Sequence, residues 1–231
     1  RYYAIDPETK EMTHTNASLA AQAVKGLFTD PTELNQIQSL IASTSQADQT
    51  LPNHGVMVHG ELNNPPCEVV STSGICLCGV TALKYAYLNI KAEEVENSVV
   101  VASEIASSMM TAKNFDKECQ HKVETLEQNP EVAFEKDFLR WMLSDGAGAA
   151  FLQNKPVAGQ LNLRIDWIDI ISYANELETC MYAGAVKQDD GQLKSWTRFS
   201  AEEVTQQSIM TVKQDVRLLN ENIVKYTVED A

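Results

Sequence analysis

Two cysteines, Cys76 and Cys78, have the clearest capacity for chemistry in this 231-residue chain, and they stand in the segment STSGICLCG at positions 71–79. This segment joins a predicted strand at 67–72 to a predicted helix at 76–88. A thiol in the first turn of a helix lies at the positive end of the helix dipole among free backbone N–H groups, which favour the thiolate. Such a cysteine is a candidate nucleophile. Buried cysteine also occurs simply as a small core residue, and spacing alone leaves both interpretations open.

A metal centre is the second chemistry that these residue types could support. Cys67 stands near the C-x-C pair, but thiolate zinc sites usually combine two C-x-x-C pairs, and the sequence has no second pair. His54 and His59 lie five residues apart, without the H-E-x-x-H arrangement of a helical zinc site. His14 and His121 stand in polar surroundings. We therefore expect no metal, and we expect the four histidines to be ordinary polar residues.

Nucleotide binding is also not expected from the motifs. The phosphate-cradling pattern G-x-x-x-x-G-K-[ST] and the hydrolase elbow G-x-S-x-G are both absent from the sequence. Gly146 and Gly148 match the first two glycines of a G-x-G-x-x-G fingerprint, but the third glycine is missing because position 151 is Phe. The sequence therefore predicts chemistry that needs no nucleotide cofactor.

Composition limits the partners and the compartment. The chain has 18 Lys and Arg against 32 Asp and Glu, a net charge of −14, which leaves no basic stripe to bind nucleic acid. No apolar run reaches the roughly 18 residues of a membrane helix, and the first residues lack signal-peptide features. The five cysteines are an odd number, which favours reduced thiols. We predict a cytoplasmic chain with neither nucleic-acid nor membrane partners.

The elements that would position the cysteines follow from hydrophobic patterns. The run NSVVVAS at 97–103 is typical of a buried strand, and the segment at 76–88 is apolar nearly all round, which predicts a buried helix. Strand, helix and strand form a βαβ unit, so we predict an α/β fold with a partly parallel sheet. Upstream, the pattern predicts a helix at 16–28, a strand at 37–44 and a helix at 54–62.

The second half of the chain alternates between helical and extended patterns. DGAGAAF at 145–151 predicts a tight turn that feeds a strand where a ligand or another backbone comes close. The other predicted elements are helices at 105–112, 117–126 and 131–143, strands at 161–173 and around 179–186, and a long helix at 202–226.

Two pieces of sequence together resemble a known family. They are GICLCGVTALKYAYLNIKAEEVENSVVVASE at 74–104 and MLSDGAGAAFL at 142–152. The pair resembles the condensing enzymes of the thiolase superfamily, closest to the 3-oxoacyl-[acyl-carrier-protein] synthase III branch. In that family the nucleophilic cysteine starts a buried helix, a strand ending in Ser-Glu or Ser-Asp follows, and a D-G-A-G-A turn comes later. The same order is found here.

The resemblance implies a thiolase-like α/β fold with αβαβα layers built from duplicated halves. Residues 1–155 would form most of the N-terminal half, which carries the nucleophile, and residues 156–231 would begin the C-terminal half. Members of the family are generally homodimers across the sheet edge. The segment at 51–61 is therefore a candidate interface and acyl-tunnel segment, and an ordinary surface loop and helix is the alternative interpretation.

The resemblance also implies an acyltransferase. Relatives with a C-x-x-G pattern match Cys76 and Gly79, so Cys76 is the expected nucleophile, with its backbone N–H in the oxyanion hole, and Cys78 is the less favoured alternative. The Cys76 thiolate would take an acyl group from acyl-CoA or acyl carrier protein. Decarboxylation of a malonyl-type thioester would then give a carbanion that forms a carbon–carbon bond. The pathway would be fatty-acid or polyketide-like biosynthesis, including the dialkylresorcinol and aryl-polyene types, and no cofactor is needed.

The family's His and Asn partners have no match among the 231 residues, and its Trp and Arg clamp for CoA has none either. Three interpretations follow. The segment belongs to a longer chain, as a first residue other than Met suggests, or it is a natural half-enzyme, or it is a non-catalytic relative. The alternative function is accordingly a non-catalytic or half-site partner subunit of a heteromeric ketosynthase.

Overall fold

The computed structural model describes residues 2–115, 139 and 141–229. The chain forms two compact units, Arg1–Ile105 with Ser144–Ile171 and Ala106–Leu143 with Ser172–Ala231. The first unit carries both cysteines of the segment at 71–79. The predicted duplicated halves at 1–155 and 156–231 stay a prediction.

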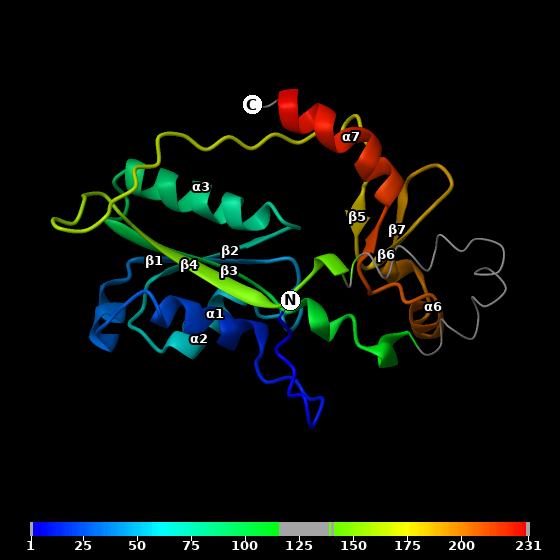
Figure 1. Ribbon diagram of the computed structural model, residues 1–231, viewed down its shortest axis with the longest axis horizontal. Coiled ribbons are helices and arrows are strands. Elements are labelled where there is room, and N and C mark those ends of the chain that lie inside the picture. Colours follow the sequence, from blue (N-terminus) through cyan, green and yellow to red (C-terminus); the bar gives the residue numbers. More distant parts are fainter. Residues whose placement is uncertain (1, 116–138, 140, 230–231) are drawn as a thin grey trace. The chain divides into compact units, whose positions relative to one another are not determined.

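A four-stranded mixed sheet is the centre of the first unit (Figure 1). Its spatial order is β2-β1-β3-β4, in which β1 is parallel to β2 and β3, and β4 is antiparallel to β3. The predicted α/β class with a partly parallel sheet is confirmed. β1 lies between the two strands of the predicted βαβ unit. The strands are β1 (Ser39–Thr44), β2 (Glu68–Ser73), β3 (Asn97–Glu104) and β4 (Gly146–Gln153).

Helices cover both faces of this sheet, α1 and α2 on one face and α3 on the other (Figure 1). Because successive side chains of a strand point to opposite faces, the buried residues form two core clusters, one on each face of the sheet. Leu40 and Val101 pack toward α1 and α2, whereas Ile41 and Val100 pack against the buried Ala82 of α3. The helices are α1 (Asn16–Lys25), α2 (His54–Leu62) and α3 (Cys78–Lys91).

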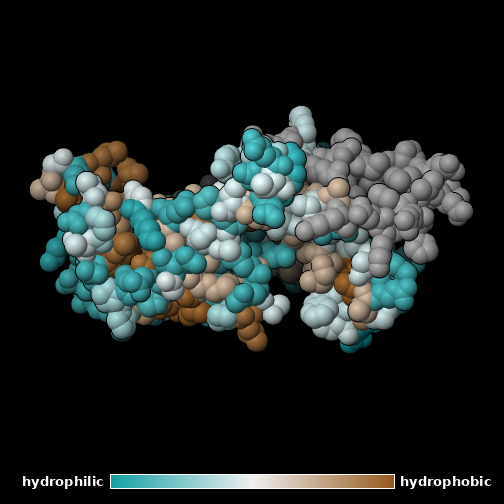
Figure 2. Space-filling view, turned by 90° about the horizontal axis from the view of Figure 1, so that it is seen from below, coloured by the Kyte–Doolittle hydropathy of each residue, from teal (hydrophilic) through white to brown (hydrophobic). Residues whose placement is uncertain are grey.

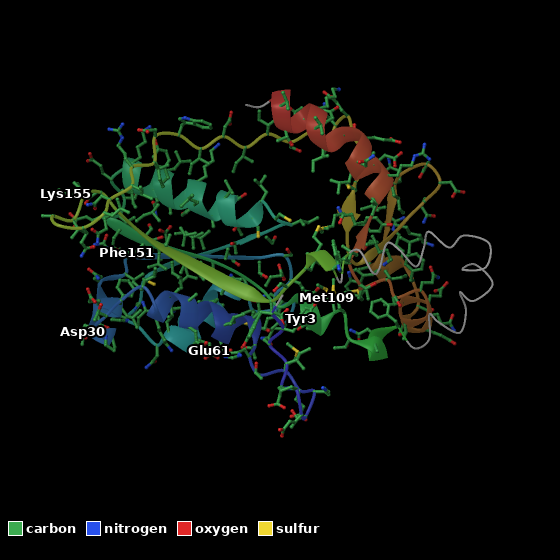
Figure 3. The ribbon with its side chains drawn as sticks, in the orientation of Figure 1. Tyr3, Asp30, Glu61, Met109, Phe151 and Lys155 are labelled. Atoms are coloured by element: carbon green, nitrogen blue, oxygen red, sulfur yellow. The ribbon has the colours of Figure 1, made fainter. Side chains whose placement is uncertain are left out.

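The side of the sheet that α1 covers is closed by aromatic packing. Phe151 of β4, which is labelled in Figure 3, lies edge-on to Phe28, with 5.2 Å between the ring centroids. Seen from below in Figure 2, the surface of this unit carries mainly hydrophilic side chains, with separate hydrophobic patches between them. The interior of the layer is therefore apolar while its outer surface is polar.

α3 departs from the prediction of a helix buried all round. Ala82 and Ala86 are buried against the sheet, but Val80, Tyr85 and Leu88 are exposed. A helix that covers one face of a sheet buries one stripe of side chains, so the other apolar residues of α3 face outward within this unit.

The predicted strand at 161–173 is wrong. The structure has no strand there, and the side chains of Leu161, Leu163 and Trp167 are exposed. Alternation of apolar and polar residues gives the period of a strand, but a strand also needs a neighbouring strand for its backbone hydrogen bonds. Tyr87 of α3 donates a hydrogen bond to the Asp166 carbonyl at 3.4 Å.

The second unit consists of short elements. The predicted helix at 202–226 is two helices, because Ser208 adopts a left-handed backbone with φ of 47° and Ile209 turns into the core. In place of the predicted strand around 179–186 the chain forms two short ones. The elements are β5 (Met181–Tyr182), which pairs with β8 (Lys213–Gln214), β6 (Ala185–Lys187), which pairs with β7 (Leu193–Ser195), α6 (Ala201–Gln206) and α7 (Val216–Glu229).

The structure also describes four short 3-10 helices. The predicted helix at 105–112 is replaced by two of them, and the predicted helices at 117–126 and, for most of its length, 131–143 lie outside the described residues. Among the described helices, none has the length and apolar character needed to cross a membrane. The 3-10 turns are η1 (Pro31–Gln36), η2 (Ala106–Ser108), η3 (Ala112–Asn114) and η4 (Trp196–Arg198).

Candidate active site

The carboxyl ends of the three parallel strands meet at one edge of the sheet. β1 ends at Thr44, β2 at Ser73 and β3 at Glu104. The chain leaves β1 toward α2 on one face and leaves β2 toward α3 on the other. Neighbouring strands whose connections run to opposite faces mark the usual ligand site of an open α/β sheet. The segment that carries the two cysteines begins at this point.

Cys78 is the first residue of α3 and is half-buried. Its backbone N–H donates to the Ile75 carbonyl at 3.1 Å, and its own carbonyl accepts from the Thr72 hydroxyl at 3.1 Å. Burial raises the pKa of the Cys78 thiol, and the negative charge of Glu104 adds to this effect, while a hydrogen bond from Ser43 opposes it. The balance favours the protonated thiol.

Cys76 is exposed and stands two residues before α3. The sequence predicted that Cys76 would lie in the first turn of the helix. In the structure it lies instead in the loop that precedes α3. Gly74 starts this loop with φ of 150°, a backbone conformation that side chains disfavour. Cys76 therefore lies ahead of the positive end of α3, where solvent and substrates can reach it.

Gly79 explains how α3 comes so close to the sheet. A Cβ placed on Gly79 would lie 3.2 Å from the Ala102 Cβ and 3.9 Å from the Ser43 Oγ. The glycine of the C-x-x-G pattern thus seats the first turn of α3 on β1 and β3. Cys78, the first residue of this turn, is thereby placed beside the sheet.

Glu104 joins the ends of β1 and β3. Its carboxylate accepts from the Ser45 backbone N–H at 2.8 Å and from the Thr44 hydroxyl at 3.3 Å. Sequence reasoning did not single out Glu104 or Ser43 as site residues. The available signal was a polar residue at the end of an otherwise buried strand, in LIASTS and in VVVASE.

The strand predicted from the DGAGAAF segment is confirmed as β4, but the predicted tight turn is wrong, because Gly146 and Gly148 lie within the strand. Asp145 is buried and its carboxylate accepts from the Ala4 N–H at 2.6 Å, which fixes the start of the strand. Gly146 pairs with Glu104 and Gly148 with Ala102, and a Cβ on either glycine would meet nothing within 4 Å. The sheet is thus uncovered beside Glu104, on the face that α3 covers elsewhere.

His54 is placed very differently from the prediction of an ordinary polar histidine. It is the first residue of α2, is 2% exposed, and has its Nε2 3.1 Å from the Ser103 Oγ. Its Nδ1 has no hydrogen-bond partner among the described residues. Burial lowers the pKa of His54, with a small opposing effect of Asp48. Ser103 follows Val101 on the face covered by α1 and α2, so His54 and Cys78 lie on opposite faces of the sheet.

The other histidines that the structure describes have hydrogen-bond partners outside the segment at 71–79. His14 contacts Thr13 and Gln22, and the His59 ring lies 3.3 Å from the Pro65 carbonyl oxygen. His121 lies outside the described residues. Within the described part of the chain, no three His, Cys, Asp or Glu side chains are placed to hold a metal ion.

A mixed sheet in the order β2-β1-β3-β4, helices on both faces and cysteines at the start of α3 define a thiolase-like fold. A solved structure, the tetronic acid condensing enzyme AbyA1, aligns with 96% of this chain at a TM-score of 0.61 and 17% sequence identity. The alignment covers 56% of the AbyA1 chain, so this chain spans little more than half of that protein's length. At this identity the alignment shows the fold.

Two further solved structures match a smaller part of the chain. A point variant of OleA from Xanthomonas campestris aligns with 61% of this chain and 42% of its own, at 20% identity and a TM-score of 0.48. PksG, an HMG-CoA synthase from Bacillus subtilis, aligns with 40% of this chain and 24% of its own, at 18% identity and a TM-score of 0.36. No family model and no curated protein matches the sequence.

Proposed function

We propose that this protein is a condensing acyltransferase of the 3-oxoacyl-[acyl-carrier-protein] synthase III type, with Cys76 as nucleophile. The supporting observation is an exposed thiol just ahead of α3, at the carboxyl end of a parallel strand, in a thiolase-like fold. The helix dipole gives this end of α3 a positive potential. Cys78, which is half-buried, is the competing candidate.

The proposed reaction has two steps. The Cys76 thiolate attacks the carbonyl carbon of an acyl-CoA or acyl-carrier-protein thioester, and the CoA or carrier thiolate leaves and takes a proton. The backbone N–H of Cys76 stabilises the oxyanion. A malonyl-type thioester then loses CO₂, and its carbanion attacks the acyl-enzyme, which forms the carbon–carbon bond and returns the Cys76 thiolate. These steps use no cofactor.

The edge of the sheet suggests how two copies of the chain would associate. Among the described strands, β2 pairs with β1 on one side and has no strand on the other. An open edge is a template for pairing with another chain. We propose a homodimer through β2, in the cytoplasm, with fatty-acid initiation as the pathway and polyketide-like synthesis as the other possibility.

A partner subunit in a heteromeric ketosynthase is the second candidate function. It is favoured by one observation, namely that the buried His54 lies on the face of the sheet opposite Cys78, so His54 is not placed to stabilise an enolate there. Co-purification with a second ketosynthase chain that supplies His and Asn would support this candidate. An active homodimer would remove it.

Acylation of the protein tests the main proposal. Purified protein is incubated with acyl-CoA and with acyl carrier protein, and its intact mass is measured. We expect one acyl group per chain in the wild type and in Cys78→Ser, and none in Cys76→Ser, with Cys180→Ser as a matched control for an unrelated half-buried thiol. An adduct that survives in Cys76→Ser and disappears in Cys78→Ser would move the nucleophile to Cys78. No adduct with any donor would contradict the acyltransferase.

A further inference from the structure

Two thiols stand two residues apart at the start of α3, and the proposed condensation uses one of them. Cys76 is exposed in the loop, whereas Cys78 is half-buried at the first position of the helix. Hydrogen peroxide and other small oxidants react with the thiols that they can reach. Cys76 is therefore the thiol of this pair that such an oxidant meets first.

The backbone between the two cysteines is a tight turn. The Cys78 N–H donates to the Ile75 carbonyl at 3.1 Å, and Leu77 has φ of −79° and ψ of −13°, which are features of a type I turn over residues 75–78. In a turn of this helical shape, the Cα atoms of Cys76 and Cys78 lie about 5.4 Å apart. Disulfides join residues whose Cα atoms are about 4.4–6.8 Å apart. The backbone therefore holds the two thiols within bridging range.

The other described cysteines are not held in this way. Cys67 directly precedes β2 and Cys76 follows it, and the 6 residues of that strand separate the two by about 20 Å. Cys180 belongs to the second unit. Among the described cysteines, Cys78 is the one that the backbone itself keeps beside Cys76.

We propose that Cys76 and Cys78 are an oxidative modification site, at which hydrogen peroxide converts the two thiols into a disulfide. The Cys76 thiolate attacks one peroxide oxygen, the O–O bond breaks, and the hydroxide that leaves takes a proton, which gives a sulfenic acid and water. The Cys78 thiolate then attacks the Cys76 sulfur, forms the S–S bond and releases a second hydroxide, which becomes water. The two thiols lose two electrons and the peroxide gains them.

The disulfide would block the site and also protect it. A sulfenic acid without a resolving thiol is oxidised further to a sulfinic acid, which thiols do not reduce. The inference rests on the proposed function in one respect, which is that Cys76 accepts the acyl group. The disulfide would then stop acylation until a dithiol reduces it.

Closing the disulfide must also change the backbone. Side chains two residues apart in a helical turn point to different sides, about 200° apart around the axis. Bringing the sulfur atoms of Cys76 and Cys78 together therefore requires the turn to open and the Cys78 N–H to leave the Ile75 carbonyl. Oxidation should be visible as faster hydrogen exchange at residues 75–81.

Intact-mass spectrometry tests the proposal without any acyl donor. Every sample carries Cys67→Ser, Cys119→Ser and Cys180→Ser, which leaves the two thiols of the turn, and circular dichroism checks that each variant is folded. Hydrogen peroxide should lower the mass by about 2 Da, the loss of two hydrogens, and dithiothreitol should reverse this. With Cys78→Ser added, we expect a dimedone adduct of the Cys76 sulfenic acid and then a gain of about 32 Da, the sulfinic acid.

Cys76→Ser in the same background is the matched control. Cys78 is then the remaining thiol and is half-buried, so peroxide should oxidise it several-fold more slowly than it oxidises Cys76 in Cys78→Ser. Equal oxidation rates of these two variants would contradict the assignment of Cys76 as the thiol that reacts first.

The mass spectra also separate this proposal from the proposed function. A sulfinic acid on Cys76 while Cys78 is present, with no loss of about 2 Da at any peroxide concentration, would overturn the proposal. If the disulfide forms but no acyl donor ever modifies the reduced protein, the proposed function is wrong and the modification site stands. If Cys76 is acylated and no disulfide forms, the proposed function stands and the modification site is wrong.

Discussion

Gly79 at the start of α3 lies directly against Ala102 of β3, and a Cβ on the glycine would be 3.2 Å from the Ala102 Cβ. This contact sets the distance between the helix that follows the cysteines and the sheet. It also brings Cys78 to the face that carries Ser43 and Glu104.

Gly79→Ala should therefore disturb the site through packing. Alanine is the better helix former by about 1 kcal/mol, but the added methyl must push α3 away from the sheet, and overpacking typically costs about 1–3 kcal/mol. We expect a net loss of up to about 2 kcal/mol in the free energy of unfolding, measured by urea denaturation, together with slower acylation of Cys76. Gly60→Ala in α2 is the matched control, because a Cβ there meets nothing within 4 Å. Equal stability of both variants would show that Gly79 has no packing role.

His54 should make stability depend on pH. Burial lowers its pKa below 6.5, so the unfolded chain binds the proton first, and the stability that comes from a neutral His54 is complete above about pH 6.5 and lost as the pH falls below it. Between about pH 7.5 and 5.5 we expect a loss of at most about 1.4 kcal/mol per pH unit.

Urea titrations at several pH values measure this dependence. In His54→Gln the slope below pH 6.5 should be smaller than in the wild type, whereas His14→Gln, at a side chain that is not buried, should keep the wild-type slope. A His54→Gln profile with the wild-type slope would place the titrating group elsewhere.

Asp48 should stabilise the first helix. Its carboxylate accepts from the backbone N–H groups of Asn16 at 2.7 Å and Ala17 at 2.9 Å, which have no partner inside α1. Asp48→Ala should cost about 1–2 kcal/mol of unfolding free energy. Asp189→Ala, at an exposed turn, should cost less than about 0.5 kcal/mol. Similar costs for the two variants would contradict the capping role.

Asp215 is expected to anchor α7 in the second unit. It accepts from the Leu218 N–H at 2.9 Å and pairs with Lys187 at 3.1 Å, and the backbone hydrogen bond holds its pKa below the ordinary value. Its stabilisation is therefore present above the unfolded pKa of about 3.8 and is lost as the pH falls through the lower folded pKa.

Amide hydrogen exchange tests this anchor locally. Asp215→Ala should raise exchange in the first turn of α7 by roughly 5-fold to 10-fold near pH 7, a loss of about 1 kcal/mol. Arg217→Gln is the control, because its ion pair with Glu221 is largely exposed and contributes little. Unchanged exchange in Asp215→Ala would show that the carboxylate does not cap α7.

The elements around the cysteines could be predicted because their patterns are local. The strand β3 follows from its β-branched run, and the helix predicted at 54–62 is found as α2, which Asn53 caps in the structure. The predictions of a strand at 161–173 and of one helix at 202–226 were wrong because these elements depend on non-local contacts or on a single backbone conformation. An alternating pattern at 161–173 does not ensure that a neighbouring strand is available for pairing. Helical spacing at 202–226 does not reveal that Ser208 adopts a left-handed backbone conformation, which ends the first helix.

The sequence by itself determined which reactive groups are available. They are two thiols at or just before the start of a helix, with a glycine directly after the second thiol and polar residues at the ends of the neighbouring strands. It also determined the partly parallel class of the sheet. The tertiary structure decided which groups face those thiols. Ser43 and Glu104 lie on strands distant in sequence, and both affect the pKa of Cys78 because β1 inserts between β2 and β3. Strand order is a non-local property. The same register places His54 on the opposite face of the sheet, because a strand alternates its side chains and each residue can point to one face alone.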